Sequence, residues 1–279
     1  MAGAAVLFGS TFVPVQDAIR HAGTLPFLAV RFLFGAAVLA AVAGRRAPWN
    51  RATVVAGVRC GAALLAGYVL QTAGLRFTTT SVSAFVTYLL VVMVPILEAG
   101  TRRTAPRPEV VAGVVVATVG LFLLTGAHLS VGRGVALTLG CAAAFAVNIV
   151  EIDRAVRPER GCPVDAVALA TVQLAVVGAG CLIPGAFLGG YRMPAASYVA
   201  ALYTGVAASA VAFGLQVWGQ RRVGPTRTSL LLMIEPVTAA LIGWFTGARL
   251  GVLAAMGAVL ILAGILVSEI GPALDRPVN

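Results

Sequence analysis

Lysine is missing from this chain, and charge of either sign is scarce. All 20 basic residues are arginine, Asp and Glu together number 10, and charged residues make up 11% of the sequence. Soluble domains carry roughly 25% charged residues, whereas 59% of this chain is hydrophobic. Water cannot cover so much apolar surface. The composition therefore excludes an ordinary soluble domain and indicates that the lipid bilayer is the solvent.

Cysteine pairs and the motifs of nucleotide and metal binding are also lacking. The four cysteines, Cys60, Cys141, Cys162 and Cys181, form no CxxC pair, and three of them lie in apolar runs, as small buried residues do. The sequence contains no Walker P-loop and no HExxH or similar ligand spacing. It therefore predicts no metal, no cofactor and no ATP drive within the chain.

Two further absences narrow the function. No basic stretch forms a soluble face with interleaved aromatics, which argues against nucleic acid despite the net charge of +10. No cluster of catalytic polar residues stands at the end of an apolar run, so a membrane-embedded enzyme such as a lipid-modifying transferase is not expected. The polar residues are scattered through both halves, which fits a gated cavity better than a passive channel or a scaffold.

Apolar runs long enough to cross a bilayer are what the sequence does contain. A transmembrane helix needs about 20 apolar residues, and ten such runs are separated by short gaps that hold turn formers and arginines. We therefore predict an all-α integral membrane protein with ten transmembrane helices. The runs cover approximately residues 2–19, 26–44, 54–75, 81–99, 109–126, 133–151, 164–188, 195–220, 228–247 and 251–270.

The arginines are distributed unevenly between the two sides that these runs define. With the N-terminus in the cytoplasm, thirteen arginines fall in the inside gaps and the tail, and five fall outside. Positive charge is enriched on the cytoplasmic side of membrane proteins. We expect a multi-pass protein of the plasma (inner) membrane with both termini in the cytoplasm.

The two halves of the chain resemble each other. The segment from Tyr68 to Arg76 matches the segment from Phe213 to Arg221 at a shift of 145, with Leu, Gln, Gly and Arg coinciding. The fifth and tenth runs match at a shift of 144, and the first and sixth match more weakly at 137. Because five is odd, the second repeat enters the membrane from the opposite side. Two inverted five-helix repeats are a common plan of secondary transporters.

The repeat fixes the expected organisation of the chain. We expect a first repeat over residues 1–127 (helices 1–5), a second over 128–272 (helices 6–10), and a short cytoplasmic tail over 273–279. The pattern carries no signal for an oligomeric state.

Three segments carry a resemblance to a known family. They are Phe8-Gly-Ser-Thr-Phe-Val, then Arg31-Phe-Leu, and the stretch from Arg221 through Gly224-Pro-Thr to Glu235-Pro-Val. They resemble the EamA branch of the drug/metabolite transporter superfamily, and the resemblance covers nearly the whole chain. It implies ten helices around a central cavity, both termini inside, and export or exchange of amino acids, other metabolites or toxic compounds.

The first half departs from this pattern. At the shift of 145, Glu235-Pro236 falls on Leu90-Val91. The family often has a proline at that first-half position, and Pro95 stands nearby as a substitute source of a helix kink. The Glu-Pro site is therefore expected in the second half alone.

Ionisable residues inside a membrane are costly and are functional candidates by default. Glu235 lies eight residues past Arg227, deep in the ninth helix. We expect it to contact a substrate amine or to exchange a proton, with a structural carboxylate as the alternative. Arg31 lies inside the second helix. It attracts an anionic substrate group, pairs with Asp17, or reaches the membrane interface.

Uncharged candidates complete the expected substrate-binding set. Gln71 and Gln216 are repeat-related, and Thr11 and Asn148 occupy matched places in the first and sixth helices. Their side chains either bind substrate or hydrogen-bond between helices. Aromatic side chains either shape the cavity or pack the bundle and anchor the interface. These are Tyr68, Tyr88 and Trp218.

The sequence thus predicts a secondary active transporter working by alternating access. Its expected cargo is a small organic metabolite, such as an amino acid or related amine, with export as the direction that the family resemblance implies. Proton coupling through Glu235 and facilitated exchange are the two alternatives, since both would leave the same sequence pattern. The alternative cargo is a nucleotide sugar or a lipid-linked compound. That cargo calls for several cationic groups in the cavity, and Arg31 is the one candidate.

Overall fold

The computed structural model is helical throughout its described residues and contains no strand there. These are residues 1–11, 15, 18, 21–44, 47–102, 105–127, 132–157, 164–188, 190–247 and 251–274, with the backbone alone at 102 and 269–274. Asp17, Cys162 and the expected tail from 275 onward lie outside this set. Seven of the twenty arginines, including Arg45 and Arg46, lie outside it as well.

The helices follow the predicted apolar runs. Within the described residues, eight segments are long and apolar enough to span a membrane, and Val252–Ser268 is a shorter apolar helix. With α1 as the first run, these account for the ten predicted helices and confirm the fold class. In order they are α1 (Ala2–Ser10), α3 (Thr24–Ala43), α4 (Arg51–Gly74), α5 (Thr80–Tyr88) with α6 (Leu90–Arg102), α7 (Pro108–Thr125), α8 (Arg133–Val156), α9 (Ala166–Leu188), α10 (Ala195–Thr204) with η2 (Gly205–Ala212) and α11 (Phe213–Gln220), α12 (Pro225–Leu232) with α13 (Ile234–Phe245), and α14 (Val252–Leu274).

Three spans are interrupted where the sequence predicted continuous helices. The fourth breaks at Leu89 and the ninth at Met233, which correspond to within one residue at the shift of 145 that relates these spans. In the ninth span, Pro236 has no N–H to donate to Leu232, which explains the break there. In the fourth span, Pro95 lies inside α6 beyond the interruption, so the break at Leu89 does not fall at this proline. The eighth span contains the π-helix η2.

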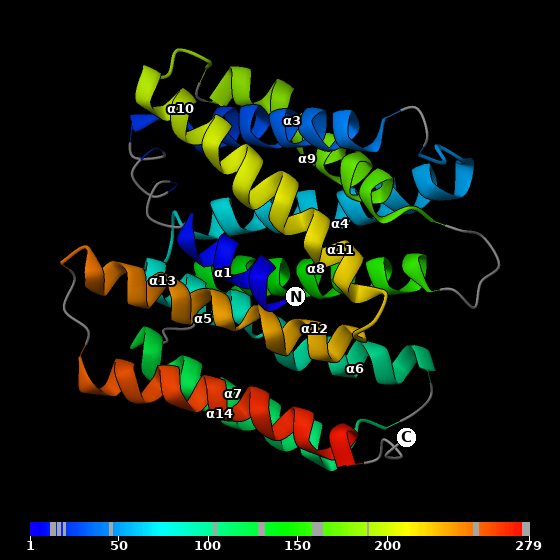
Figure 1. Cartoon of the computed structure of the whole chain (residues 1–279). Helices are drawn as coiled ribbons and strands as arrows, with labels where there is room; N and C mark the ends of the chain where they lie inside the picture. Colours follow the sequence, from blue (N-terminus) through cyan, green and yellow to red (C-terminus); the bar gives the residue numbers. More distant parts are fainter. Residues whose placement is uncertain are drawn as a thin grey trace.

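The helices lie side by side in layers (Figure 1). Helices α3, α9 and α10 form one outer layer, and α7 with α14 forms the other. Between them lie α1, α5, α6, α8, α12 and α13. The two closest outer pairs, α7 with α14 and α3 with α9, each join a span to its counterpart in the other repeat. Helices that pack on their own counterparts lie next to the pseudo-twofold axis of an inverted repeat.

Glycine contacts between α7 and α14 show this symmetry residue by residue. A Cβ at Gly113 would lie 2.5 Å from the carbonyl oxygen of Gly264, and one at Gly120 would lie 2.7 Å from that of Gly257. The shift of 144 maps Gly113 onto Gly257 and Gly120 onto Gly264, so the two contacts exchange under the repeat. Such self-complementary contact is the mark of a twofold interface.

A second pair of contacts repeats in the same way. Gly74 lies against Thr138, and Gly219 lies against Met1. The shift of 145 relates the two glycines, and the shift of 137 relates Met1 to Thr138. Residues related by the sequence shifts therefore occupy equivalent places in the two halves of the structure.

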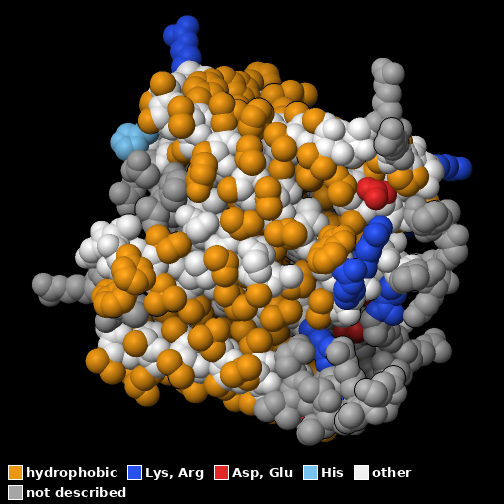
Figure 2. Space-filling view, in the orientation of Figure 1, with side chains coloured by type: hydrophobic (Ala, Val, Ile, Leu, Met, Phe, Trp, Pro, Cys, Tyr) orange, Lys and Arg blue, Asp and Glu red, His pale blue; other side chains and the backbone are white. Residues whose placement is uncertain are grey.

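Hydrophobic side chains cover most of the surface in Figure 2, as lipid contact requires. Arginines of the described chain gather at one end of the bundle, from the start of α4, the end of α8 and the α11–α12 turn. We call this the Arg-rich end, and it carries Arg51, Arg154, Arg157, Arg221, Arg222 and Arg227. The opposite, Arg-poor end carries Arg76, Arg133 and Arg192 among the described residues.

The crossed glycine contacts generate a stability prediction. Gly113→Ala inserts a methyl group against the Gly264 backbone and Ser268, which cannot retreat without separating α7 from α14. We expect a loss of about 1–3 kcal/mol, the usual cost of overpacking. Gly100→Ala is the matched control, since no atom lies within 4 Å of its Cβ. Thermal unfolding of the purified protein in lipid nanodiscs checks both. Equal midpoints for the two variants would contradict the close contact.

Candidate functional site

A central cavity of about 260 Å³ lies between seven of the spans. Its walls come from α1, α3, α4, α5 and α6, α8, α11, α12 and α13. The volume suits a small molecule, being near the lower end of ligand pockets at about 300 Å³. Eight of the nine candidates named from the sequence line it: Thr11, Arg31, Tyr68, Gln71, Tyr88, Asn148, Gln216 and Glu235.

Glu235 reaches the cavity because the ninth span is interrupted. It is the second residue of α13, directly after the break at Met233, and its side chain is partly accessible. Tyr88 is the last residue of α5, directly before the equivalent break at Leu89, and its side chain interacts with Glu235. Interrupted helices present side chains and free backbone groups to a transport site. Here both interruptions meet at one carboxyl group.

Arg31 lines the same cavity from α3. Its Nε donates to the Ser209 hydroxyl at 3.0 Å, and its guanidinium lies 5.2 Å from the Phe32 ring centroid. Ser209 belongs to η2, which approaches α3 closely because Gly35 faces it without a side chain. Among the described residues Arg31 forms no ion pair, and Tyr68 and Glu235 are the titratable groups whose charges act on it. The suggested partner Asp17 lies outside those residues.

The amide side chains of the cavity differ in the number of hydrogen bonds that they already form. Asn148 donates from Nδ2 to the Cys60 carbonyl at 2.8 Å and to Gln173 Oε1 at 3.3 Å. Gln71 donates to the Thr87 hydroxyl at 3.3 Å. Gln216 has no hydrogen bond to any described residue, although it is 3% exposed. Its amide is therefore the one with unused hydrogen-bonding capacity for a ligand.

Two aromatic pairs form the apolar wall of the cavity. Phe8 meets Phe213 with ring centroids 5.0 Å apart, and Tyr68 meets Phe145 at 5.4 Å, both edge to face. The repeat shifts of 137 and 145 map Phe8 onto Phe145 and Tyr68 onto Phe213, so the two pairs are equivalents. The three phenylalanines were not among the predicted site residues. The repeat alignment does indicate them, because aromatic residues coincide at both pairs of positions.

The remaining candidate, Trp218, does not reach the cavity. It is 50% exposed, and the Arg222 guanidinium lies 4.2 Å from its ring centroid. Tryptophan and arginine at a helix end are typical of the membrane interface. Thr11 lines the cavity, but its hydroxyl donates to the Phe8 carbonyl at 2.9 Å.

Ten apolar helices in two inverted halves around a polar cavity define a polytopic membrane transporter. Residues 1–126 and 132–269 match the model of the EamA-like transporter family, and the chain belongs to that family, within the drug/metabolite transporter superfamily. The matches point to a transporter rather than to an enzyme.

Two similar proteins were compared with this chain. An uncharacterized transporter of Archaeoglobus fulgidus is 32% identical over 149 residues, which are 53% of this chain and 46% of that protein. The match thus spans about half the length of this relative. A protein of known crystal structure superposes with a TM-score of 0.81 at 20% identity, covering 99% of this chain and 98% of its own. That likeness shows the fold.

The unequal bonding of the two cavity amides generates a prediction. Asn148→Ala leaves the Cys60 carbonyl and the Gln173 side chain without their partner, whereas Gln216→Ala breaks no hydrogen bond among the described residues. We expect Asn148→Ala to cost about 1–2 kcal/mol of stability and Gln216→Ala much less. Thermal unfolding midpoints in nanodiscs check this. A larger loss for Gln216→Ala would show that its amide is structural.

Proposed function

We propose that the chain is a secondary active transporter of a small zwitterionic metabolite, such as an amino acid or a related amine. One observation carries the proposal. The central cavity contains both a cation, Arg31, and a carboxyl group, Glu235, beside a wall of aromatic rings. A zwitterion offers a carboxylate to the first and an ammonium to the second. Its apolar part would pack on the rings.

The energetics of charge in a membrane support this reading. An uncompensated charge near the bilayer centre costs about 3 kcal/mol or more. Arg31 and Glu235 are not joined in an ion pair, so each retains capacity for an external partner of opposite sign. Ammonium groups also bind favourably over aromatic faces. A nucleotide sugar would need more positive charge, and Arg31 is the one cation among the described residues of the cavity wall.

The inverted repeats support alternating access as the transport mechanism. Residues 1–127 and 128–272 would exchange conformations, so that the cavity opens to one side and then to the other. By the positive-inside rule, the Arg-rich end would face the cytoplasm of the plasma membrane together with both termini. Export is the proposed direction, by family resemblance. Glu235 would carry the coupling proton, because a carboxyl in the cavity can exchange a proton between the two open states.

Glu235→Gln tests the coupling. In liposomes, uptake of labelled amino acids and amines is measured with and without a pH gradient. We expect the gradient to stimulate transport by the wild type and not by Glu235→Gln, because the amide keeps the shape but binds no transported proton. Glu109→Gln is the matched control, with an exposed carboxylate at the start of α7. Equal stimulation in all three proteins would remove Glu235 from coupling.

Arg31→Gln tests recognition of the substrate carboxylate. A hydrogen bond to a charged group contributes about 1.5–3 kcal/mol, so we expect apparent affinity for an amino acid to fall roughly tenfold to hundredfold. Affinity for the decarboxylated amine of the same side chain should change much less. Arg51→Gln, an exposed arginine at the start of α4, is the control. Equal losses for acid and amine would mean that Arg31 only supports the fold.

A further inference from the structure

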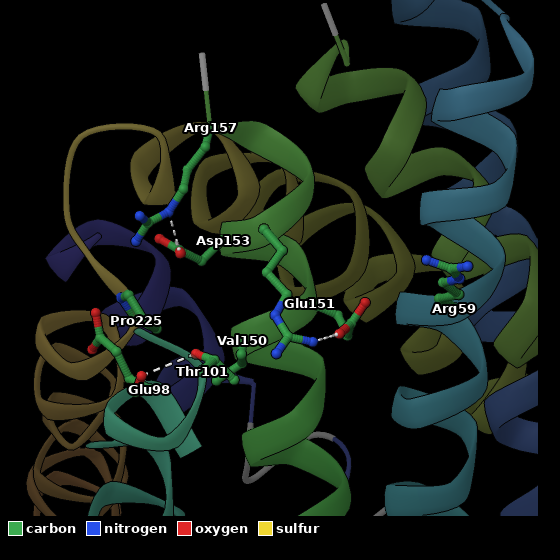
Figure 3. A pocket seen from close by; sticks show the side chains of 9 residues that line it. Arg59, Glu98, Thr101, Val150, Glu151, Asp153, Arg157 and Pro225 are labelled. Atoms are coloured by element: carbon green, nitrogen blue, oxygen red, sulfur yellow. Dashed lines mark hydrogen bonds and ion pairs between the residues drawn. The ribbon is translucent and has the colours of Figure 1, made fainter. Parts of the chain in front are cut away.

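A second polar pocket of about 240 Å³ lies at the Arg-rich end, apart from the central cavity (Figure 3). Its wall includes Glu98 of α6 and a run of charged side chains at the end of α8. On that run Arg154 pairs with Glu151, and Arg157 donates to Asp153 at 2.6 Å. This charged pocket faces the cavity across a thin apolar layer.

The layer between the two spaces is a cluster of buried apolar side chains. Leu90, Ile149 and Leu232 belong to this cluster and line the central cavity. Val150 belongs to the same cluster and lines the polar pocket. Ile149 and Val150 are consecutive in α8, so neighbouring residues of one helix border the cavity and the pocket. We call Leu90, Ile149, Val150 and Leu232 the plug.

Polar bonds fasten the elements that supply the plug. Glu98 Oε2 accepts from the Thr226 hydroxyl at 2.6 Å and from the Thr226 N–H at 3.3 Å. This joins α6 of the fourth span to α12 of its repeat counterpart, the ninth. Gln220 donates from Nε2 to the Ile149 carbonyl at 3.0 Å, which joins α11 to α8. We call the Glu98–Thr226 contact the clasp.

Part of this closure changes character across the repeat. At the shift of 145, Leu90 corresponds to Glu235 and Leu232 to Thr87, which are polar residues of the cavity wall. Glu98 corresponds to Gly243, which has no side chain to accept a bond. Leu90, Leu232 and Glu98 therefore have no like residue at the matched positions of the other repeat.

We propose that the charged pocket is the closed inner mouth of the transport path, and that the plug and the clasp form the gate between it and the central cavity. The inference rests on the proposed function, since a transporter by alternating access needs both routes. Opening requires α6 and α12 to separate, which breaks the clasp and withdraws Leu90 and Leu232 from Ile149. The paired charges of the pocket then line the exit.

The test is the accessibility of the cavity from each face of the membrane, without substrate. In a variant whose four native cysteines are replaced by alanine, Ala84→Cys places a thiol on the cavity wall. Membrane vesicles of both orientations are treated with a membrane-impermeant maleimide. Glu109→Cys, exposed at the Arg-rich end, reports the orientation. The gate changes are Glu98→Ala, which removes both bonds of the clasp, Thr226→Val, which removes the hydroxyl bond and keeps the N–H bond, their double variant, and Leu90→Ala.

We expect each clasp variant to increase labelling of Ala84→Cys from the Arg-rich face about fivefold to tenfold, as the loss of a hydrogen bond shifts a two-state equilibrium. Leu90→Ala, which removes packing and no hydrogen bond, should raise labelling as well. The double variant should match Glu98→Ala, because that change alone already removes both bonds of the clasp. Glu109→Gln and Leu262→Ala, exposed changes on α7 and α14, should have no effect.

Two outcomes overturn the gate. Labelling from the Arg-rich face unchanged in variants that remain monodisperse shows that the clasp and the plug do not close this route. An equal rise from both faces shows general loosening. Transport assays on the same proteins separate this inference from the proposed function. A selective rise in labelling without transport of any zwitterion supports the gate and contradicts the cargo, whereas transport with unchanged labelling does the reverse.

Discussion

The absence of water from the bilayer core is the constraint on which this structure depends. Backbone groups must be bonded within each helix, and a charge is tolerated only where the protein itself surrounds it. Arg31 and Glu235 meet this requirement by facing the same internal space. Arg31, on α3, is held through Ser209 of η2, and Glu235 follows the break at Met233. Irregular backbone therefore lies next to both charged residues of the cavity.

Much of this fold could be read from the sequence, because bilayer thickness limits helix length and the repeat shifts define symmetry. The shifts of 137, 144 and 145 reappear as crossed contacts, Gly113 with Gly264 and Gly120 with Gly257 among them. The interruption at Met233 agrees with the missing N–H of Pro236. The one at Leu89 could not be predicted, since no proline stands at the matched position and hydropathy does not report local backbone geometry. The sequence also does not report how each helix is rotated, which determines the side chains that face the cavity. Trp218 is an example, since it lies close to Gln216 in sequence but on the outer surface.

The packing contacts between the helices follow the repeat symmetry, whereas charged residues such as Glu235 depart from it. The edge-to-face pairs Phe8–Phe213 and Tyr68–Phe145 exchange under the repeat, as the crossed glycines do. Glu235 has Leu90 as its counterpart, so the cavity receives one carboxyl group and the plug one apolar side chain. A single position in the repeat therefore serves two purposes, which a strictly duplicated sequence could not provide.

The equivalence of the two aromatic pairs has a consequence for how binding energy is used. If the halves exchange conformations, each pair takes the place of the other, and an apolar ligand group finds the same rings in both access states. Such a group adds affinity to both states alike, and a ligand shifts an equilibrium only through its difference in affinity between them. Bias between the two states must then come from the unpaired features, Arg31 and Glu235. An uncharged aromatic compound of the same shape would occupy the cavity as an inhibitor without driving the exchange.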